Sequence, residues 1–251
     1  MQKLTLLLLM ASLLFACNNK HTQVNTLPET SKTIMNDSTT KTMKVLLLNG
    51  SPNKEGCTFT ALSEVAKALN ENGIETEIIQ IGSQAIRGCI ACAKCRETGV
   101  CVFDDLVNEV AEKAKTADGF IFGSPVYYSG INGTMKSFLD RLFYSGSRHL
   151  AYKPGAGVVS ARRAGTVAAW QQLNMYFTIN NMPVVSSQYW NMVHGNTPDE
   201  VRQDKEGLQI MRTLGNNMAW LLKSIEAGKE AGVEKPKQEP RERTNFIRSE
   251  P

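Results

Sequence analysis

A short apolar run followed by a polar, glycine-containing loop most constrains how this chain can fold. The run is residues 44–49 (KVLLLN) and the loop is residues 50–58 (GSPNKEGCT). Apolar residues then recur with the spacing of one buried helix face, at Leu62, Val65, Ala66 and Leu69. A strand, a polar loop and a helix in this order direct backbone N–H groups and the positive end of a helix dipole toward an anion.

The loop lacks the patterns of the two common nucleotide phosphate loops. Five residues separate its two glycines, and Cys57 stands where a P-loop has its lysine. The G-x-G-x-x-G pattern of dinucleotide-binding proteins is also absent from the loop. Ser51, Asn53 and Thr58 can donate side-chain hydrogen bonds. We therefore expect a site for a single phosphomonoester, such as that of FMN, and the alternative is an ordinary turn.

Strands and helices are predicted to alternate along the rest of the folded part. Further strands are expected at residues 75–81, 120–122, 157–159 and 184–189, with helices between them and a last long helix over residues 198–226. Such alternation predicts an α/β fold with a parallel sheet covered by helices on both faces. Five strands fit the doubly wound, flavodoxin-like order 2-1-3-4-5.

In such a sheet, ligands bind outside the carboxyl ends of the strands. The third expected strand ends in Pro125, Val126, Tyr127 and Tyr128, flanked by glycines that fix the path of the backbone. This backbone can present N–H and C=O groups to a flat ring, and the tyrosines can stack on or enclose an isoalloxazine. The alternative is that the tyrosines pack at a subunit contact.

The fourth expected strand ends in Ser160, Arg162 and Arg163. The two arginines are suited to stabilising negative charge on a reduced flavin or to binding the phosphate of a second nucleotide. The alternative is that both are simply solvated.

The fifth expected strand is followed by Trp190, Asn191 and His194. These three are candidates for lining a substrate cleft. Ordinary packing is the alternative, since a single histidine after an aromatic residue is more often part of the structure than of a site.

Four cysteines between the second and third strands have the spacing Cys89-x2-Cys92-x2-Cys95-x5-Cys101. Three thiolates two residues apart can wrap one face of a 4Fe-4S cluster, and a fourth can arrive from a short turn. A four-cysteine zinc site is one alternative. Disulfides or free thiols are the other, particularly in an oxidising compartment.

The two ends of the chain differ in composition from the part between them. Residues 4–14 are an apolar run too short to span a bilayer, and the sequence through Cys17 resembles a bacterial lipobox. That resemblance implies cleavage before Cys17 and acylation of this residue, which would anchor the protein stably. A plain signal peptide and a true start at Met43 are the alternatives. We expect a polar tether over residues 18–43 and a charged tail over residues 229–251.

The remaining 44–228 segment is expected to form one FMN-binding domain. The chain of 251 residues is 42% hydrophobic, which is sufficient for a core, and it carries a net charge of +4. Its basic residues are scattered, so we predict no nucleic-acid interface.

Residues 45–56, 123–141 and 190–195 together resemble the NAD(P)H-dependent FMN reductases of the flavodoxin-like superfamily. Residues 88–95 with Cys101 resemble the iron–sulfur flavoproteins within it. The resemblance implies tightly bound FMN, electron transfer through that flavin, and a homodimer or homotetramer with flavin near the subunit interface. Cys57 departs from the family pattern, which usually has asparagine there.

The expected function is therefore an FMN oxidoreductase that passes electrons from NAD(P)H or a carrier to a quinone, nitroaromatic, flavin or similar acceptor. The chemistry occurs on FMN, so no catalytic side chain is expected. The alternative is a membrane-tethered flavin or metal electron carrier without turnover of its own. A lipid anchor places the protein at a membrane, on the periplasmic side, whereas a start at Met43 makes it cytoplasmic. Export conflicts with a preloaded cluster, because no twin arginine lies near the start.

Overall fold

The computed structural model describes residues 42–242 and residue 244. The expected signal peptide with Cys17 and the tether up to residue 41 lie outside this part of the chain. Within it, no helix is both long and apolar enough to cross a membrane.

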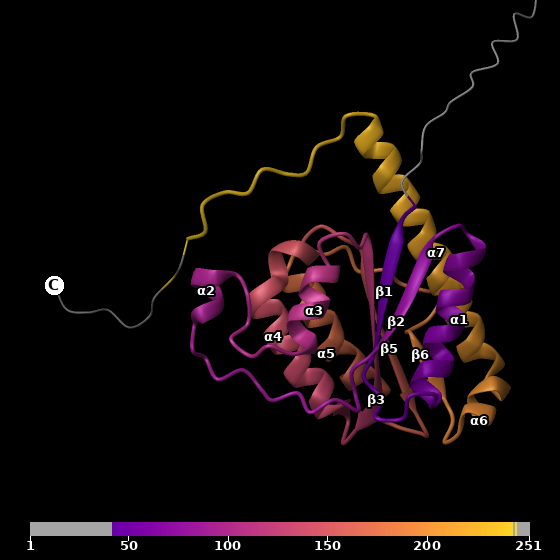
Figure 1. Ribbon diagram of the computed structural model, residues 1–251. Coiled ribbons are helices and arrows are strands. Elements are labelled where there is room, and N and C mark those ends of the chain that lie inside the picture. Colours follow the sequence, from indigo (N-terminus) through magenta and orange to yellow (C-terminus); the bar gives the residue numbers. More distant parts are fainter. Residues whose placement is uncertain (1–41, 243, 245–251) are drawn as a thin grey trace, which may run out of the picture. The chain divides into compact units, whose positions relative to one another are not determined.

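A parallel sheet forms the centre of the domain, in the order β2-β1-β3-β5-β6 (Figure 1). Its strands are β1 (Lys44–Asn49), β2 (Glu75–Gln80), β3 (Gly119–Tyr127), β5 (Gly155–Ala161) and β6 (Met192–His194). The short β4 (Gly130–Ile131) pairs antiparallel with the end of β3 and lies off this path. With β4 set aside, the order is the predicted flavodoxin-like one.

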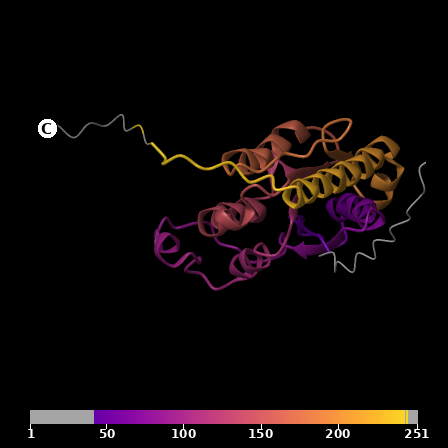
Figure 2. The same cartoon turned by 90° about the horizontal axis from the view of Figure 1, so that it is seen from above.

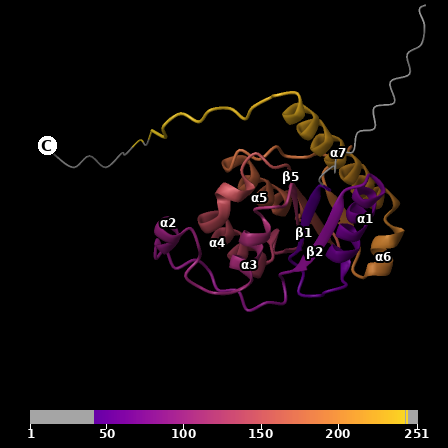
Figure 3. The same cartoon turned by 45° about the horizontal axis from the view of Figure 1, so that its top comes forward.

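Helices cover both faces of the sheet, as Figures 1, 2 and 3 show from different directions. On one face lie α3 (Leu106–Lys113), α4 (Gly133–Leu150) and α5 (Thr166–Ile179). On the other lie α1 (Cys57–Glu71), α6 (Pro198–Gln203) and α7 (Lys205–Glu230). The short α2 (Lys94–Thr98) belongs to the cysteine-rich segment.

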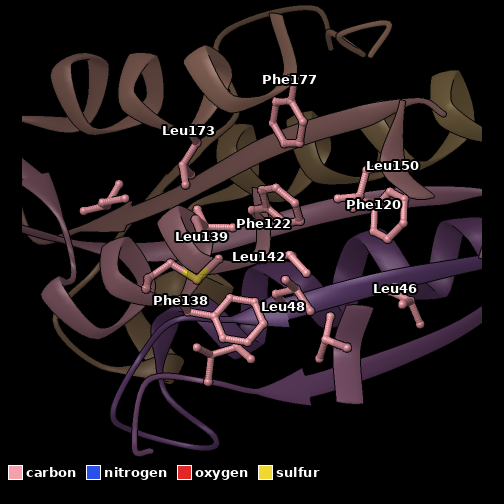
Figure 4. Packing of buried hydrophobic residues seen from close by; sticks show 14 of the residues in the cluster. Leu46, Leu48, Phe120, Phe122, Phe138, Leu139, Leu142, Leu150, Leu173 and Phe177 are labelled. Carbon is pink, nitrogen blue, oxygen red and sulfur yellow. The ribbon is translucent and has the colours of Figure 1, made fainter. Parts of the chain in front are cut away.

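The apolar runs of the strands supply two cores, because successive side chains point to opposite faces. Leu46 and Leu48 contribute to the core beneath α3, α4 and α5, where the rings of Phe122 and Phe177 stack with centroids 4.8 Å apart (Figure 4). Val45 and Leu47 contribute to the core beneath α1 and α7. The helix face predicted after β1 is buried as expected.

The fifth strand lies later in the chain than predicted. Only Val184 of residues 184–189 bridges to the sheet, and the strand proper is β6. The carbonyl of Ser186 instead accepts a hydrogen bond from Asn217 of α7, at 2.8 Å. The carbonyl of Ser186 thus bonds to a helix side chain and not to a neighbouring strand, and the segment leaves the sheet after Val184 despite its β-branched residues.

The last predicted helix is divided at Asp204. One carboxylate oxygen of Asp204 accepts from Gly207 N at 2.9 Å and so caps α7. The other oxygen accepts from His194 N at 2.7 Å. Asp204 therefore ends α6, begins α7 and ties both to the carboxyl end of β6. Beyond Glu230, residues 231–242 form no regular element and are exposed.

Candidate functional site

The loop after β1 is held in place by its own polar groups. Asn49 is fully buried, accepts from Ser51 N at 3.1 Å and donates to the carbonyl of Lys54 at 3.1 Å. The hydroxyl of Ser51 accepts from Asn53 N at 3.1 Å, and Gln80 donates to the carbonyl of Ser51 at 2.7 Å. The loop is therefore ordered by contacts within the protein.

Helix α1 begins directly after this loop without a side-chain cap. The first N–H groups of an α-helix have no acceptor within the helix, so those of α1 are available to a ligand beside Ser51 and Asn53. Burial is the main cause that raises the pKa of the Cys57 thiol. The thiol is thus neutral at pH 7 and places no negative charge beside this helix end. Uncapped amides and an ordered polar loop fit the phosphate of FMN.

Two of the expected cofactor ligands bind each other. The hydroxyl oxygens of Thr58 and Ser160 lie 2.8 Å apart, and both residues are buried. This bond joins the first turn of α1 to the end of β5. By contrast, no described residue accepts a hydrogen bond from the hydroxyl of Ser51 or the side-chain amide of Asn53, so both can donate to a phosphate.

The segment expected as a loop after the third strand is a strand end followed by a tight turn. Strand β3 continues through Pro125 and Val126 to Tyr127, which pairs with Gly130 of β4. Tyr128 and Ser129 form the turn with φ of 50° and 61°. Positive φ at both central residues matches the twist of a two-residue hairpin, which explains why pairing continues. Tyr128 is fully exposed at the tip.

The β5–α5 loop lies against this hairpin turn. A Cβ added at Gly165 would lie 2.8 Å from Oγ of Ser129, so the two loops are in direct contact. Arg162 and Arg163 are exposed in this loop, and no hydrogen bond or ion pair engages either side chain in the part of the chain described. Two cations without a partner among the described residues thus lie in a loop that contacts the hairpin turn at the carboxyl edge of the sheet.

The three expected cleft residues lie at β6 (Met192–His194) and just before it. Asn191 is 1% exposed and precedes β6, and its side-chain amide has no partner in the described structure. Trp190 is half exposed and also precedes β6, whereas His194 ends this strand. Because the strand lies later than predicted, Trp190 and Asn191 come before it and His194 lies at its carboxyl end.

The four cysteines line a single cavity of about 500 Å³, walled on one side by Asp140, Arg141 and Tyr144 of α4 (residues 133–150). The cavity is lined by Cys89, Cys92, Cys95 and Cys101, and all four thiols are free. Among described residues, no three His, Cys, Asp or Glu side chains converge as a ready site for an ion. Four unpaired thiols around one cavity still fit a group that thiolates ligate from several sides.

The backbone between these cysteines has an uncommon conformation. Ala91 and Ala93 have φ of 53° and 58°, in the left-handed region that non-glycine residues rarely adopt. The cysteines on either side of these two alanines line the same cavity. Backbone strain of this kind is often found at functional sites.

Sequence reasoning missed the residues that hold Cys101. Asn108 accepts from Cys101 N at 3.0 Å and donates to the carbonyl of Cys101 at 3.0 Å. The buried Arg141 donates from Nε to Sγ of Cys101 at 3.2 Å and pairs with Asp105. Burial lowers the pKa of Arg141, but its bonds to Asp105 and Cys101 raise it above its ordinary value. The available signal was that Arg141 follows Phe138 by three positions on the inward face of a helix.

A doubly wound parallel sheet with an ordered phosphate-sized loop at its carboxyl edge defines a protein of the flavodoxin-like class. The family model for NADPH-dependent FMN reductase matches residues 43–197, and the chain belongs to this family.

Its relatives include iron–sulfur flavoproteins. One from Methanocaldococcus jannaschii is 36% identical over 196 residues, covering 73% of this chain and 99% of that protein. One from Methanosarcina thermophila is 29% identical over 195 residues, covering 75% of this chain and 100% of that protein.

Solved structures share the fold at low sequence identity. A flavone reductase aligns with a TM-score of 0.59 at 20% identity, over 73% of this chain and 64% of its own. An NAD(P)H:quinone oxidoreductase from Methanothermobacter marburgensis aligns with a TM-score of 0.54 at 19% identity, over 70% of this chain and 97% of its own. A flavodoxin, WrbA-like protein from Agrobacterium tumefaciens aligns with a TM-score of 0.54 at 16% identity, over 73% of this chain and 98% of its own.

Proposed function

We propose that this protein is an FMN-dependent oxidoreductase that passes electrons from NAD(P)H or an electron carrier to a small acceptor such as a quinone, nitroaromatic or flavin. The observation that carries the proposal is the uncapped start of α1 beside the ordered loop of Ser51 and Asn53, at the sheet edge that also presents Tyr127 and Tyr128. Bound FMN supplies the redox chemistry, and the chain supplies binding, orientation and charge.

Different residues at the carboxyl edge of the sheet bind the phosphate, contact the ring and provide charge. Ser51, Asn53 and the first amides of α1 bind the phosphate, while the neutral thiol of Cys57 allows the dianion to approach. Pro125 and Val126 present backbone to the ring, and Tyr128 covers it from the turn. Arg162 and Arg163 provide positive charge where an anionic nucleotide or acceptor approaches.

The test is flavin binding by the chain from Met43 onward. We expect a yellow protein whose released cofactor is FMN, with Ser51→Ala and Asn53→Ala each weakening the affinity by on the order of tenfold, as loss of a charge-assisted hydrogen bond does. Ser224→Ala is the matched control, because its hydroxyl donates only to the carbonyl of Trp220 within α7. Purified protein that takes up no FMN would refute the proposal.

For the four cysteines we propose a 4Fe-4S cluster that relays single electrons between an external donor and the flavin. The iron–sulfur flavoprotein names of the relatives and the shared cavity support this assignment. Anaerobic protein is expected to contain about four irons and matching acid-labile sulfide per chain. One zinc per chain, or thiols that pair as disulfides, would refute it.

A second candidate is an electron carrier without turnover of small molecules. The exposure of Cys89 and Cys92 favours it, because a protein donor can then approach the cavity closely. Rapid steady-state oxidation of NAD(P)H with a soluble acceptor argues for the enzyme. Flavin reduction by a ferredoxin-type donor alone argues for the carrier.

We also propose that the protein forms a homodimer or homotetramer. Tyr144, Met175 and Ile179 are large side chains on α4 and α5 that are 67%, 66% and 75% exposed, and a second copy would bury them. Light scattering is expected to give a dimer or larger mass, and Met175→Glu is expected to reduce it. A monomeric wild type would contradict this.

A further inference from the structure

Arg141 is a buried cation that binds a carboxylate, a thiol and two backbone carbonyls. It is 1% exposed, and its Nη1 and Nη2 donate to the two carboxylate oxygens of Asp105 at 2.7 and 2.9 Å. Its Nε–H donates to Sγ of Cys101 at 3.2 Å, and its terminal nitrogens also donate to the carbonyls of Arg87 and Phe103, at 3.4 and 3.3 Å. One planar group therefore holds a carboxylate on one side and a thiol on the other.

The orientation of this guanidinium is fixed from several directions. Asp105 caps α3 by accepting from Val107 N, so the carboxylate that holds Arg141 is itself anchored to a helix. The ring of Phe103 lies 4.9 Å from the guanidinium carbon. Because a guanidinium is rigid and planar, fixing its two terminal nitrogens also fixes the direction of Nε–H.

Cys101 is held through both its backbone and its sulfur. Its backbone is clamped on both sides by Asn108, and its sulfur faces the positive end of the ion pair. By contrast, Cys89 receives only a backbone N–H, from Ala91 at 3.4 Å, and both Cys89 and Cys92 are exposed. Within the described chain, the sulfur of Cys101 alone takes a hydrogen bond from a charged side chain.

We propose that Arg141 is a positioning residue that orders Cys101 as the first ligand of the four-cysteine site and raises the reduction potential of the group held there. The inference rests on the proposed cluster. A hydrogen bond from a cation to a ligating sulfur withdraws electron density and favours the reduced state, so its removal lowers the potential. Asp105 opposes this effect, since its negative charge partly neutralises the guanidinium.

The test compares two substitutions that are expected to act with opposite signs. Arg141→Lys keeps a charge, but a single ammonium cannot reach carboxylate and sulfur together, so the midpoint potential of the iron–sulfur signal falls. Asp105→Asn keeps a good helix cap and leaves the cation facing Cys101 without its counter-ion, so the potential rises. A tenfold change in the equilibrium corresponds to about 59 mV for one electron. Redox titration followed by electron paramagnetic resonance measures both, with the FMN potential recorded on the same samples.

Arg148→Gln is the matched control. Arg148 lies on the same helix and donates to the carbonyl of Gly99 in the cysteine segment at 3.4 Å, but to no sulfur. Its substitution is expected to leave the potential unchanged. Arg141→Lys is also expected to increase iron loss to a chelator by on the order of tenfold, as for other outer ligands of metal sites.

The outcomes separate this inference from the function on which it rests. Opposite shifts in the two variants, with Arg148→Gln unchanged, support it, and either variant alone suffices if the other does not fold. If the variants keep their full iron content and the midpoint potential of the cluster does not change, the inference about Arg141 is overturned while the cluster stands. Arg141 is then only one half of a structural ion pair. A wild type without iron refutes the cluster itself, and the inference with it.

Discussion

Tyr128 occupies a conformation that costs stability, and the cost is explained if its ring contacts the cofactor. Its φ of 50° is unfavourable for a residue with a Cβ, and the ring is fully exposed. Replacing it by glycine relieves about 1 kcal/mol of this strain. We therefore expect Tyr128→Gly to raise the melting temperature of the flavin-free protein and to weaken FMN binding, as measured by thermal unfolding and flavin fluorescence.

Ser129→Gly separates the two effects. Ser129 is the other central residue of the turn, with φ of 61°, and it carries no ring. The stability gain is expected to be similar and the affinity for FMN unchanged. Equal loss of FMN affinity in both variants would show that turn flexibility, and not the tyrosine ring, accounts for the effect.

Arg162 and Arg163 allow a prediction about the electron donor. If they bind the phosphates of a second nucleotide, Arg162→Gln with Arg163→Gln raises the KM for NAD(P)H while kcat and the FMN potential stay near those of the wild type. If they instead stabilise reduced flavin, the FMN potential falls. Lys237→Gln with Arg241→Gln, in the exposed C-terminal segment, is the control for the loss of two charges. No change in KM or in potential would show that both arginines are simply solvated.

Individual residues were predictable where the signal is local. The loop of Ser51 and Asn53 and the spacing of the four cysteines could be read from neighbouring positions alone. Arg141 could not, because its contact with Cys101 joins residues 40 positions apart. The pairing of Thr58 with Ser160 likewise depends on how α1 crosses the end of β5, which no local pattern encodes.

At the scale of elements, Asn108 of α3 holds the end of the cysteine segment. It makes three hydrogen bonds at 3.0 Å to the backbone of Cys101 and Phe103. Asn108→Ala removes all three, at a cost of about 1–3 kcal/mol of local stability. We expect faster loss of iron in air and faster hydrogen exchange over residues 99–105, with FMN content unchanged.

Asn217→Ala is the comparison for this variant. Asn217 also supports an irregular segment, through the carbonyl of Ser186, but far along the chain from the cysteines. It is expected to lose stability without losing iron. If both variants lose iron equally, the loss of iron reflects a general loss of stability and not the loss of the hydrogen bonds made by Asn108.

The order of elements was predictable and some of their limits were not. Long buried runs such as that of β1 define strands by themselves, whereas Val184 and its neighbours have strand-like residues that the fold directs to α7. The three residues of β6 have too short a pattern to be recognised. The hairpin at Tyr128 was hidden for a different reason, since it places non-glycine residues where glycine is usual.

At the scale of the whole molecule, the amino-terminal prediction and the cluster prediction place opposing demands on one chain. Acylation at Cys17, which lies outside the described residues, requires export, while clusters are normally assembled before it. We expect the full chain to partition into detergent and to take up a fatty acid label, with both lost in Cys17→Ala.

The form that starts at Met43 is the reference for cofactor content. Equal iron per chain in the lipidated and Met43 forms would mean that the folded domain is loaded before or during export. Iron confined to the Met43 form, with FMN in both, would mean that the four cysteines serve the cytoplasmic form alone and that the anchored protein works through its flavin. Absence of the fatty acid label from the full chain would contradict acylation at Cys17. The proposed cluster would then no longer conflict with a requirement for export.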